Sequence, residues 1–388
     1  MNPLYANMPT TIFEHMSALA RETGAINLGQ GFPDTNGPED VIAQAARALS
    51  EASNQYPPMP GLTLLRQAVA DHYRRHHAVD LDWQQEVIVT SGATEALAAA
   101  ILALVTPGDE VVLIQPMYDA YLPLVLRAGG VPRFVTLQPP EWRISREALE
   151  AAFTPKTRLV ILNNPINPSA TVVPAEDLAL LAGFVVASDA VVVSDEVWEH
   201  VVFDGRAHQS ILGVPGLRDR AVKIGSGGKI FAMTGWKVGW TCAAPAITRV
   251  IAKAHQFLTF TTPPNLQAGV AYGLGKENGY FTAMRADFAR SRDRLSDGLT
   301  AAGWSVLPSA GTYFLSVDLI ASGIHLDDVT FCERLVREFG VAAIPISAFY
   351  TEDAVRHVAR LCFAKTDATL DAAIPRLALA RETLATAA

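Results

Sequence analysis

Residues Arg158–Ser169 read RLVILNNPINPS, an apolar run that ends in asparagines and prolines. Continuous apolar residues without polar alternation are typical of a strand buried on both faces of a parallel sheet. Asparagine and proline favour turns, so we expect the strand to end near Asn163 and the motif Asn164–Ser169 to follow it. Open α/β sheets bind ligands beyond the carboxyl ends of their strands, which makes this turn a candidate binding segment.

The same pattern recurs on both sides of this stretch. Helix-like segments, such as Thr94–Val105 and Ala175–Val186, alternate with apolar runs, and Pro107-Gly108 ends the first of these helices. This alternation predicts an α/β fold with crossover helices. The predicted strands are Glu86–Thr90, Glu110–Ile114, Arg133–Leu137, Arg158–Asn163, Ala190–Ser194 and Ala221–Gly225.

The last third of the chain has a different character. Gly279–Ala302 is predicted to be one extended helix that leaves the α/β core. Short strands then surround a single helix, Asp327–Phe339, which indicates an α+β lobe that the first forty residues can join. We therefore predict a large α/β domain at 46–278 and a small α+β domain at 1–45 and 279–388. The predicted strands of the small domain are Trp304–Pro308, Thr312–Asp318, Val341–Pro345 and Val358–Phe363.

The composition is that of a globular protein. Half of the 388 residues are hydrophobic and 18% are charged, which argues against a disordered chain. Apolar runs such as Leu178–Ala187 reach only about half the length of a bilayer-spanning helix. The formal charge of −8, with basic and acidic residues interleaved, argues against nucleic-acid binding. The first basic residue is Arg21, so we see no secretory signal and expect a cytoplasmic protein.

The cysteine and histidine patterns predict no metal site. Cys242, Cys332 and Cys362 are too scattered for a cysteine-based zinc site or a disulfide framework. The nine histidines include the pair His76-His77 in a basic helix. We interpret this pair as exposed surface rather than as metal ligands.

Two glycine-rich segments fail as nucleotide-binding motifs. Gly225–Lys229 resembles a P-loop, but Ile230 stands where a magnesium ligand is required. Gly29-Gln30-Gly31 could open a dinucleotide fingerprint, but Asp34 takes the place of the third glycine and the segment precedes the sheet. The chain also lacks the His-Glu-x-x-His and Gly-x-Ser-x-Gly motifs of zincin proteases and nucleophile-elbow hydrolases.

Four short segments are predicted at the ligand-binding edge of the sheet. They are Thr90–Glu95, Asn164–Ser169, Ser194–Trp198 and Ser226–Lys229, the last followed by Lys237. Together they resemble the cofactor-binding segments of class I/II aminotransferases, which are pyridoxal-phosphate enzymes of fold type I. The subgroup that contains methionine aminotransferase and the kynurenine/glutamine transaminases is similar at Asn27–Asp34, Met233–Trp240 and Arg360–Lys365.

The resemblance implies a fold and a reaction. The fold would be a mostly parallel seven-stranded sheet flanked by helices, with a smaller α+β domain. The enzyme would use pyridoxal 5′-phosphate to move the amino group of an apolar, sulfur-containing, aromatic or amide amino acid to a 2-oxo acid by a ping-pong mechanism. A homodimer with shared active sites is also implied. Two alternatives stay open, a pyridoxal-phosphate-dependent cysteine-conjugate C–S β-lyase and a non-catalytic pyridoxal-phosphate-binding protein.

Three residues carry the expected chemistry. Lys229 supplies an amine that can form a Schiff base with the cofactor aldehyde and then carry a proton from the substrate Cα. Asp195 ends an apolar strand, where a carboxylate needs a partner such as a protonated pyridine nitrogen. Asn167 matches the asparagine that hydrogen-bonds the 3′ oxygen of the cofactor, and it is also expected to contact the substrate.

The other cofactor contacts concern the phosphate and the ring. Tyr118 matches the aromatic residue that stacks on the pyridine ring. Tyr56 matches the tyrosine that reaches the phosphate bound by the neighbouring subunit. A helix start and a nearby cation suit a phosphate group. The matching donors are the backbone N–H groups of Gly92, Ala93 and Thr94, the Ser226 hydroxyl and the Lys237 ammonium.

The predicted substrate site centres on Arg360. This residue corresponds to the arginine that clamps the substrate α-carboxylate, a role suited to a planar donor of two hydrogen bonds. We identify no second arginine for a side-chain carboxylate, which favours apolar, aromatic or amide donors over aspartate and glutamate. The other predicted substrate residues are Gly31, Phe13 and Phe349 and, from the partner subunit, Phe260.

One position departs from the family pattern. Trp198 stands where relatives carry a tyrosine whose hydroxyl helps to hold the 3′ oxygen of the cofactor. An indole N–H donates a hydrogen bond but cannot accept one. We therefore expect Trp198 to shift the pKa of the Schiff-base nitrogen that joins Lys229 to the cofactor, and to slow turnover. Identical absorbance titrations of the wild type and Trp198→Tyr would contradict this expectation.

Overall fold

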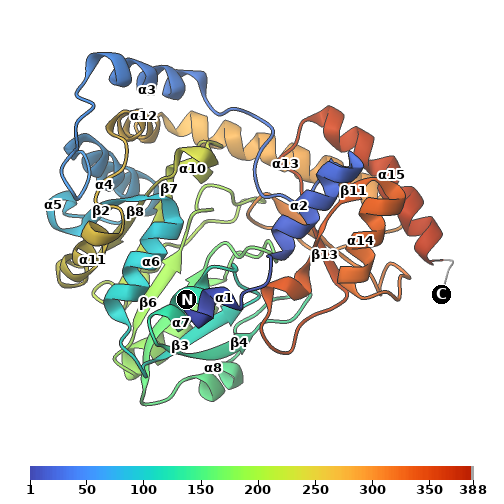
Figure 1. Ribbon diagram of the computed structural model, residues 1–388, viewed down its shortest axis with the longest axis horizontal. Helices are drawn as coiled ribbons and strands as arrows, with labels where there is room; N and C mark the ends of the chain where they lie inside the picture. The colour runs from blue at the N-terminus through green and yellow to red at the C-terminus, as the bar shows by residue number, and fades with distance from the viewer. Residues whose placement is uncertain (386–388) are drawn as a thin grey trace.

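A seven-stranded sheet forms the centre of the protein. The computed structural model describes residues 1–385, and the sheet occupies the left-hand lobe in Figure 1. Its β8 runs antiparallel to both neighbours, β2 and β7, whereas the other neighbouring strands run parallel. In sheet order, the strands are β2 (Val87–Ser91), β8 (Val238–Ala243), β7 (Ala221–Ser226), β6 (Val191–Asp195), β5 (Thr157–Asn163), β3 (Glu110–Gln115) and β4 (Val131–Thr136).

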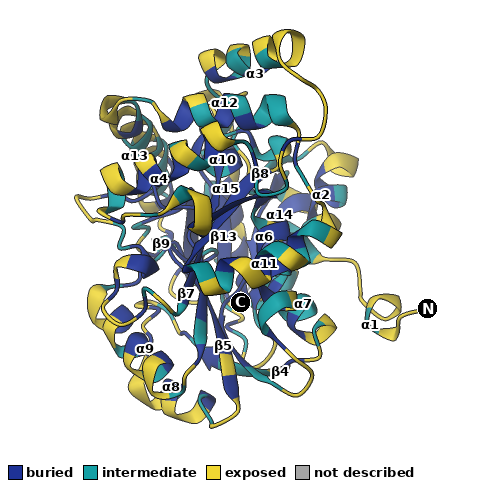
Figure 2. Ribbon diagram, turned by 90° about the vertical axis from the view of Figure 1, so that its left-hand side faces the viewer, coloured by how far each residue is buried: buried dark blue, intermediate teal, exposed yellow. Residues whose placement is uncertain are grey.

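Helices cover both faces of this sheet, which explains the continuous apolar runs. Leu159 and Ile161 of β5 lie in one hydrophobic core together with residues of α6 (Gly92–Leu104). Val160 and Leu162 lie in a second core with residues of α4 (Thr63–His77) and α9 (Ala175–Ala187). Successive side chains of a strand point to opposite faces, so every residue of this strand interior must be apolar. Figure 2 shows the resulting buried strands between helices whose outer faces are exposed.

The remaining elements of the left-hand lobe are mostly helices around this sheet. They are α3 (Glu39–Glu51), α5 (Trp83–Glu86), α7 (Tyr121–Arg127), α8 (Arg146–Ala152), α10 (Gly227–Ile230), α11 (Pro245–Leu258), α12 (Pro264–Leu274) and the short 3-10 helices Ile211–Gly213 and Thr234–Trp236. The short α1 (Pro3–Ala6) has no buried residue. Within residues 1–385, no helix combines the length and apolarity that crossing a membrane requires.

The second lobe is built on a four-stranded sheet at the right of Figure 1. Its strands follow the order β12 (Ile344–Pro345), β13 (Val358–Cys362), β10 (Phe314–Asp318) and β9 (Ser305–Val306), and all of its pairs are antiparallel. The 3-10 helix Ile346–Phe349 follows β12. The helices around this sheet are α13 (Asn278–Ala301), α14 (Asp328–Phe339) and α15 (Asp367–Ala385).

The amino-terminal residues belong to this second lobe. β1 (Ile26–Asn27) pairs in parallel with β11 (Val341–Ala342). Met16 and Leu19 of α2 (Ile12–Thr23) lie in the same hydrophobic core as residues of α14 and β13. These contacts support the predicted division into 46–278 and 1–45 with 279–388, which stays a prediction.

Two of the elements that we did not predict from the sequence show why such predictions fail. β8 lacks a run of valine, isoleucine and leucine because glycine, tryptophan, threonine and cysteine occupy Gly239–Cys242. The nineteen-residue α15 contains Pro375, a residue that argues against a helix interior in a sequence. The six predicted strands of the large domain are present, with ends that differ by at most two residues.

Candidate active site

A cavity of about 220 Å³ lies at the carboxyl end of the large sheet. Strand ends and helix starts line it, as expected for an open α/β sheet. The lining of this cavity contains every residue that we predicted to bind the cofactor except Tyr56, which we assigned to the neighbouring subunit. The predicted residues in the lining are Gly92, Ala93, Thr94, Tyr118, Asn167, Asp195, Trp198, Ser226, Lys229 and Lys237.

One end of the cavity suits an anion. Helix α6 begins at Gly92 directly after β2, and its first N–H groups have no partners within the helix. The Gly92 backbone is left-handed, with φ of +71°, and a Cβ there would lie 3.2 Å from Cε of Lys237. A Cβ at Gly239 would lie 2.7 Å from the carbonyl carbon of Gly92. Among residues 1–385, Lys237 has no ion-pair partner, so its charge is available to a phosphate.

Asp195 is a buried carboxylate that suits a positively charged partner. It ends β6 and is only 5% exposed. Its Oδ2 accepts a hydrogen bond from the Tyr121 hydroxyl at 2.7 Å, and the Asn163 side-chain amide donates to its backbone carbonyl at 2.8 Å. Burial raises the pKa of Asp195, although the Tyr121 hydrogen bond opposes this effect. A protonated pyridine nitrogen is a partner that would stabilise the charged carboxylate.

Lys229 lies between these two groups in the short α10. Its Nζ is within 3.3 Å of the Gly31 carbonyl oxygen and 3.3 Å of the Tyr313 hydroxyl, and it lies 4.8 Å from the centre of the Trp198 ring. Burial lowers the pKa of Lys229 to about 8, although the negative charge of Asp195 opposes this effect. A lower pKa raises the fraction of neutral amine, which is the nucleophilic form.

Arg360 on β13 contributes a buried cation from the second lobe. Its two terminal nitrogens donate to Asn167 Oδ1 and to the Gly29 carbonyl oxygen, both at 2.7 Å, while its buried Nε has no hydrogen-bond partner. Burial lowers the pKa of Arg360 to about 10. No carboxylate of the described residues lies within ion-pair distance of this guanidinium, which is therefore suited to an anionic substrate group.

Aromatic rings surround Arg360. Its guanidinium carbon is 3.9 Å from the centre of the Phe314 ring, 5.2 Å from that of Phe349 and 5.6 Å from that of Phe13. Phe13 and Phe349 also contact each other edge to face at 5.3 Å. The structure thus brings the predicted substrate residues Gly31, Asn167, Phe13 and Phe349 close to Arg360 or Lys229.

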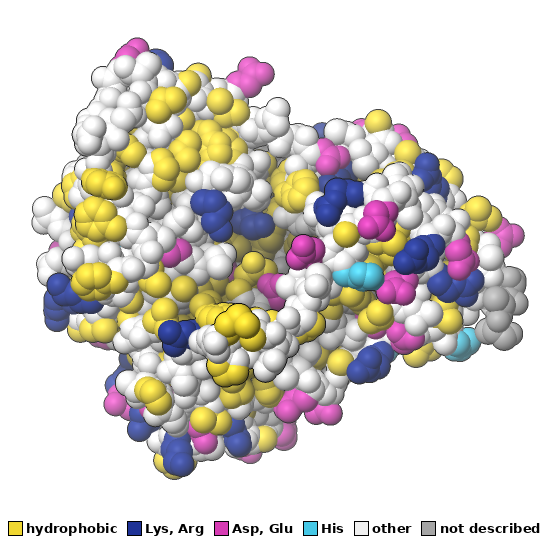
Figure 3. Space-filling view, in the orientation of Figure 1, with side chains coloured by type: hydrophobic (Ala, Val, Ile, Leu, Met, Phe, Trp, Pro, Cys, Tyr) yellow, Lys and Arg dark blue, Asp and Glu magenta, His cyan; other side chains and the backbone are white. Residues whose placement is uncertain are grey.

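Tyr56 and Phe260 do not reach the cavity within one chain. Their rings pack edge to face at 5.6 Å, and their exposed fractions are 83% and 39%. Further exposed apolar residues, Phe257 and Tyr272, lie on the neighbouring helices α11 and α12. Figure 3 shows hydrophobic side chains gathered over the upper left of the molecule, around α3 and α12.

Three polar residues of the site were not predicted from the sequence. Asn163 donates to the Asp195 carbonyl, and its side-chain oxygen accepts from the Asn167 N–H at 2.7 Å. Tyr121 binds Asp195, and Tyr313 binds Lys229. Asn163 is the last residue of a predicted strand, so its position at the ligand-binding edge was a usable signal. Tyr121 and Tyr313 carry no comparable signal in the sequence.

This donor set fits pyridoxal phosphate. It offers a helix start and a free lysine for phosphate, a buried carboxylate for a pyridine nitrogen and an amine of lowered pKa for the aldehyde. Fold and site together define a pyridoxal-phosphate enzyme of fold type I. The family model for aminotransferase class I and II matches residues 23–377, and the chain belongs to this family of pyridoxal-phosphate enzymes.

Relatives cover almost the whole chain. The chain is 44% identical to the probable N-succinyldiaminopimelate aminotransferase of Mycobacterium tuberculosis over 97% of this chain and 98% of the relative. It is 45% identical to the methionine aminotransferase of Escherichia coli over 95% of both chains. Solved structures from the same two organisms, of an N-succinyldiaminopimelate aminotransferase and of a protein with methionine aminotransferase function, each superpose with a TM-score of 0.94. The first covers 98% of this chain and 100% of that chain, and the second 98% and 99%.

Proposed function

We propose that this aminotransferase takes its amino group from an apolar, sulfur-containing, aromatic or amide amino acid and passes it to a 2-oxo acid. The observation that carries the proposal is the surroundings of Arg360. Its guanidinium is buried without a carboxylate partner, and the rings around it are those of Phe13, Phe314 and Phe349. An α-carboxylate would bind the guanidinium in two hydrogen bonds, and the side chain would contact the rings.

Different residues of the cavity would bind different parts of the cofactor. When bound, pyridoxal phosphate supplies an aldehyde carbon that links to amines and a ring that delocalises the electrons of the Cα–H bond. We propose that Lys237, Ser226 and the start of α6 hold the phosphate. Asp195 keeps the pyridine nitrogen protonated, and Tyr118 stacks on the ring.

We propose that Lys229 removes the proton from the substrate Cα in the first half-reaction. In the second half-reaction it delivers a proton to the carbon of the 2-oxo acid that becomes the new Cα. The lowered pKa of Lys229 leaves part of its amine neutral near neutral pH, which a base requires. The Gly31 carbonyl and the Tyr313 hydroxyl fix the position of Nζ between them. Asn167 links the two halves of the site, because its side-chain oxygen binds Arg360 and its amide nitrogen remains for the 3′ oxygen of the cofactor.

A second donor is supported by one comparison. The relative from Mycobacterium tuberculosis, named as a probable N-succinyldiaminopimelate aminotransferase, is as similar to this chain as the methionine aminotransferase of Escherichia coli. N-succinyl-2,6-diaminopimelate carries two carboxylates besides its α-carboxylate, and these require further cations. Lys237 and Arg360 are already assigned to the phosphate and the α-carboxylate, so we favour the apolar and aromatic donors.

A panel of amino donors tests this proposal. The kcat/KM of the holoenzyme is measured with methionine, phenylalanine, kynurenine, glutamine, N-succinyl-2,6-diaminopimelate, aspartate and glutamate, each with the same 2-oxo acid. We expect one of the first four to have the highest value and aspartate the lowest. N-succinyl-2,6-diaminopimelate or aspartate as the best donor would overturn the proposal. Release of pyruvate and ammonia from a cysteine conjugate, without transamination, would favour a β-lyase.

We also propose a homodimer in which Tyr56 and Phe260 complete the cavity of the neighbouring subunit. Both rings are exposed in one chain and stand beside further exposed apolar side chains, which supports an interface there. A cytoplasmic location is likewise a proposal. It is supported by three buried free cysteines, because disulfides are typical of oxidising compartments.

A further inference from the structure

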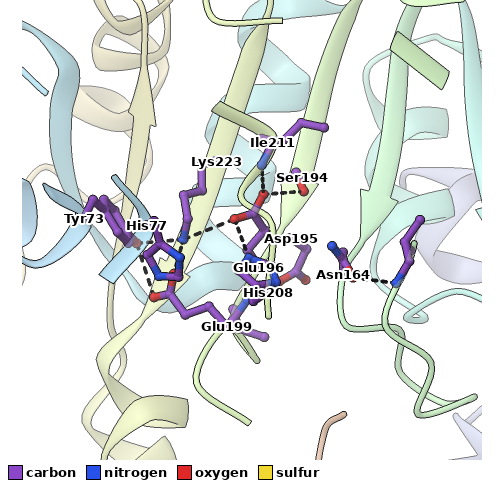
Figure 4. A network of polar contacts seen from close by, with 12 residues as sticks. Tyr73, His77, Asn164, Ser194, Asp195, Glu196, Glu199, His208, Ile211 and Lys223 are labelled. Carbon is purple, nitrogen blue, oxygen red and sulfur yellow. Dashed lines mark hydrogen bonds and ion pairs between the residues drawn. The ribbon is translucent and has the colours of Figure 1, made fainter. Parts of the chain in front are cut away.

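A second buried polar cluster lies beside the segment that carries Asp195. Three histidines come from one end of α4 and two from the chain after β6. The cavity next to them measures about 380 Å³. Figure 4 shows Lys223 between Glu196 and Glu199, with His77 and His208 beside them. The histidines of this cluster are His72, His76, His77, His200 and His208.

The structure corrects our interpretation of the histidine pair. The His77 side chain is only 4% exposed, and His76 is half-buried. The apolar positions of α4 place this end of the helix against the sheet, so the basic stretch does not lie wholly in solvent. The ring centres of His72 and His76 are 4.5 Å apart because residues four apart share one face of a helix.

Four of these side chains are arranged like metal ligands. One ligand atom from each of His72, His77, Glu199 and His200 lies within 4.8 Å of the other three. Nε2 of His72 and Nε2 of His200 share a hydrogen bond of 2.7 Å. Nε2 of His77 lies 3.2 Å from Oε2 of Glu199. Three imidazoles and one carboxylate are a common ligand type for divalent transition metals.

Several ring nitrogens in this cluster are buried without a hydrogen-bond partner. They include Nδ1 of His77, whose Nε2 is the atom that contacts Glu199. Nε2 of His76 and Nδ1 of His208 are also unpartnered. Buried polar atoms in native proteins are nearly always paired, so unpaired nitrogens around one cavity indicate a missing partner.

Two buried carboxylates share one lysine in this cluster. Glu196 and Glu199 carry two negative charges, and Lys223, whose Nζ is 3.5 Å from Glu196 and contacts Glu199, supplies one positive charge. Arg206 and Arg285 also line the cavity, so charges of both signs surround the histidines.

We propose that His72, His77, His200 and Glu199 bind one divalent transition-metal ion of the zinc class. Tetrahedral coordination with zinc–nitrogen distances of about 2.0–2.1 Å requires the facing nitrogens of His72 and His200 to separate by roughly half an ångström. Four protein ligands make this a closed, structural site. It would connect the end of α4 to the turn after β6, the same turn that carries Asp195 and Trp198 toward the cofactor cavity.

Metal binding to the intact enzyme tests the proposal. The holoenzyme is dialysed against a chelator and titrated calorimetrically with Zn²⁺, and the Co²⁺ form is examined for the visible absorption bands of tetrahedral coordination. We expect one ion per chain in the wild type. His77→Ala and His200→Gln should each weaken binding by at least about tenfold, in the range seen when metal sites lose a supporting group. His325→Ala removes an exposed histidine outside the cluster and should bind like the wild type.

Folding of each variant is checked by circular dichroism, so that a lost site is distinguished from a lost fold. Glu199→Gln, which keeps the shape of the side chain, is the second variant if His200→Gln does not fold. Wild-type protein without a stoichiometric site would overturn the proposal. So would equal affinity in the wild type, His77→Ala and Glu199→Gln, because the ion would then bind elsewhere.

Discussion

Lys229 is buried, yet its amine must be charged at one stage of the reaction and neutral at another. Its Nζ has two oxygen neighbours, the Gly31 carbonyl and the Tyr313 hydroxyl, and no carboxylate of residues 1–385 lies within ion-pair distance. These neighbours accept hydrogen bonds without supplying a full negative charge. Desolvation therefore dominates, and the pKa of Lys229 falls to about 8.

This lowered pKa predicts a pH dependence of stability in the cofactor-free protein. Between about pH 8 and the ordinary lysine pKa of about 10.4, the unfolded chain holds more protons at this position than the folded chain. The free energy of unfolding should therefore rise with pH across this window, by about 3 kcal/mol in total. Urea unfolding of the wild type and of Lys229→Met, followed from about pH 7.5 to about pH 10, isolates this contribution because other groups titrate in both proteins. Parallel curves for the two proteins would contradict it.

Neighbouring residues on one turn serve different sites. Asp195 and Trp198 line the cofactor cavity, whereas Glu196 and Glu199 contact Lys223 on the other side of the chain. The sequence indicated the first role of this segment, because an acidic residue after an apolar strand stands out. It could not indicate the second, because the histidines that meet Glu199 come from a helix more than a hundred residues earlier.

At the scale of elements, the phosphate end of the cavity depends on how closely β8 approaches the start of α6. The backbone of Gly239 leaves no room for a side chain, since its Cβ would lie 2.7 Å from the Gly92 carbonyl carbon and 2.9 Å from the Ala93 nitrogen. Both contacts are backbone atoms of the helix start. A side chain at this position would therefore displace the N–H groups that we assign to the phosphate.

Gly239→Ala tests this packing. We expect a loss of about 1–3 kcal/mol in the free energy of unfolding, as for other overpacked cores, and at least a tenfold weaker affinity for pyridoxal phosphate. Gly183→Ala is the matched control, because Gly183 is exposed on α9 and a Cβ there meets no atom within 4 Å. The control should gain roughly 0.5–1 kcal/mol from the better helix propensity of alanine and keep its cofactor affinity. Chemical denaturation and cofactor titration measure both effects, and equal affinities in the two variants would contradict the assignment of this end to the phosphate.

The elements differ in how far they could be predicted. Strands buried on both faces, such as β5, have apolar runs that are typical of such strands, and we predicted them from the sequence. β8 was missed because its residues are set by local packing and not by a hydrophobic pattern. Its single glycine, Gly239, makes room for the start of α6. The same distinction holds in the site. Family-like motifs located the backbone of the cavity, whereas Tyr121 and Tyr313 reach it from elements that carry no motif.

At the scale of the whole molecule, the site draws on both lobes. Asp195 and Lys229 come from the lobe of the large sheet, and Arg360 comes from β13 of the second lobe. Asn167 joins Arg360 to the cofactor side of the cavity. We propose that a partner subunit adds the third part. The exposed Tyr56 is the residue that tests this most directly.

Mixed subunits provide the test. Lys229→Ala lacks the amine, and Tyr56→Phe lacks the hydroxyl that we assign to the neighbouring phosphate. If sites are shared, a heterodimer of the two variants contains one site with both groups intact. With random pairing, an equal mixture that is unfolded and refolded together should recover about a quarter of the wild-type sites, since half of the dimers are mixed and each has one intact site of two. Activity equal to the average of the two separately refolded variants would contradict shared sites.

The pairing of β1 with β11 cannot form until most of the chain has been synthesised. Ile26 leaves the ribosome early, whereas its partner Val341 is among the last residues made. At about 5–20 residues per second, the interval between them is on the order of tens of seconds. During that time the large sheet can already be complete, while the apolar face of α2, with Met16 and Leu19, has no core to enter. The apolar face of α2 is thus exposed for longer than the strands of the large sheet, and we expect a chaperone to bind it during synthesis.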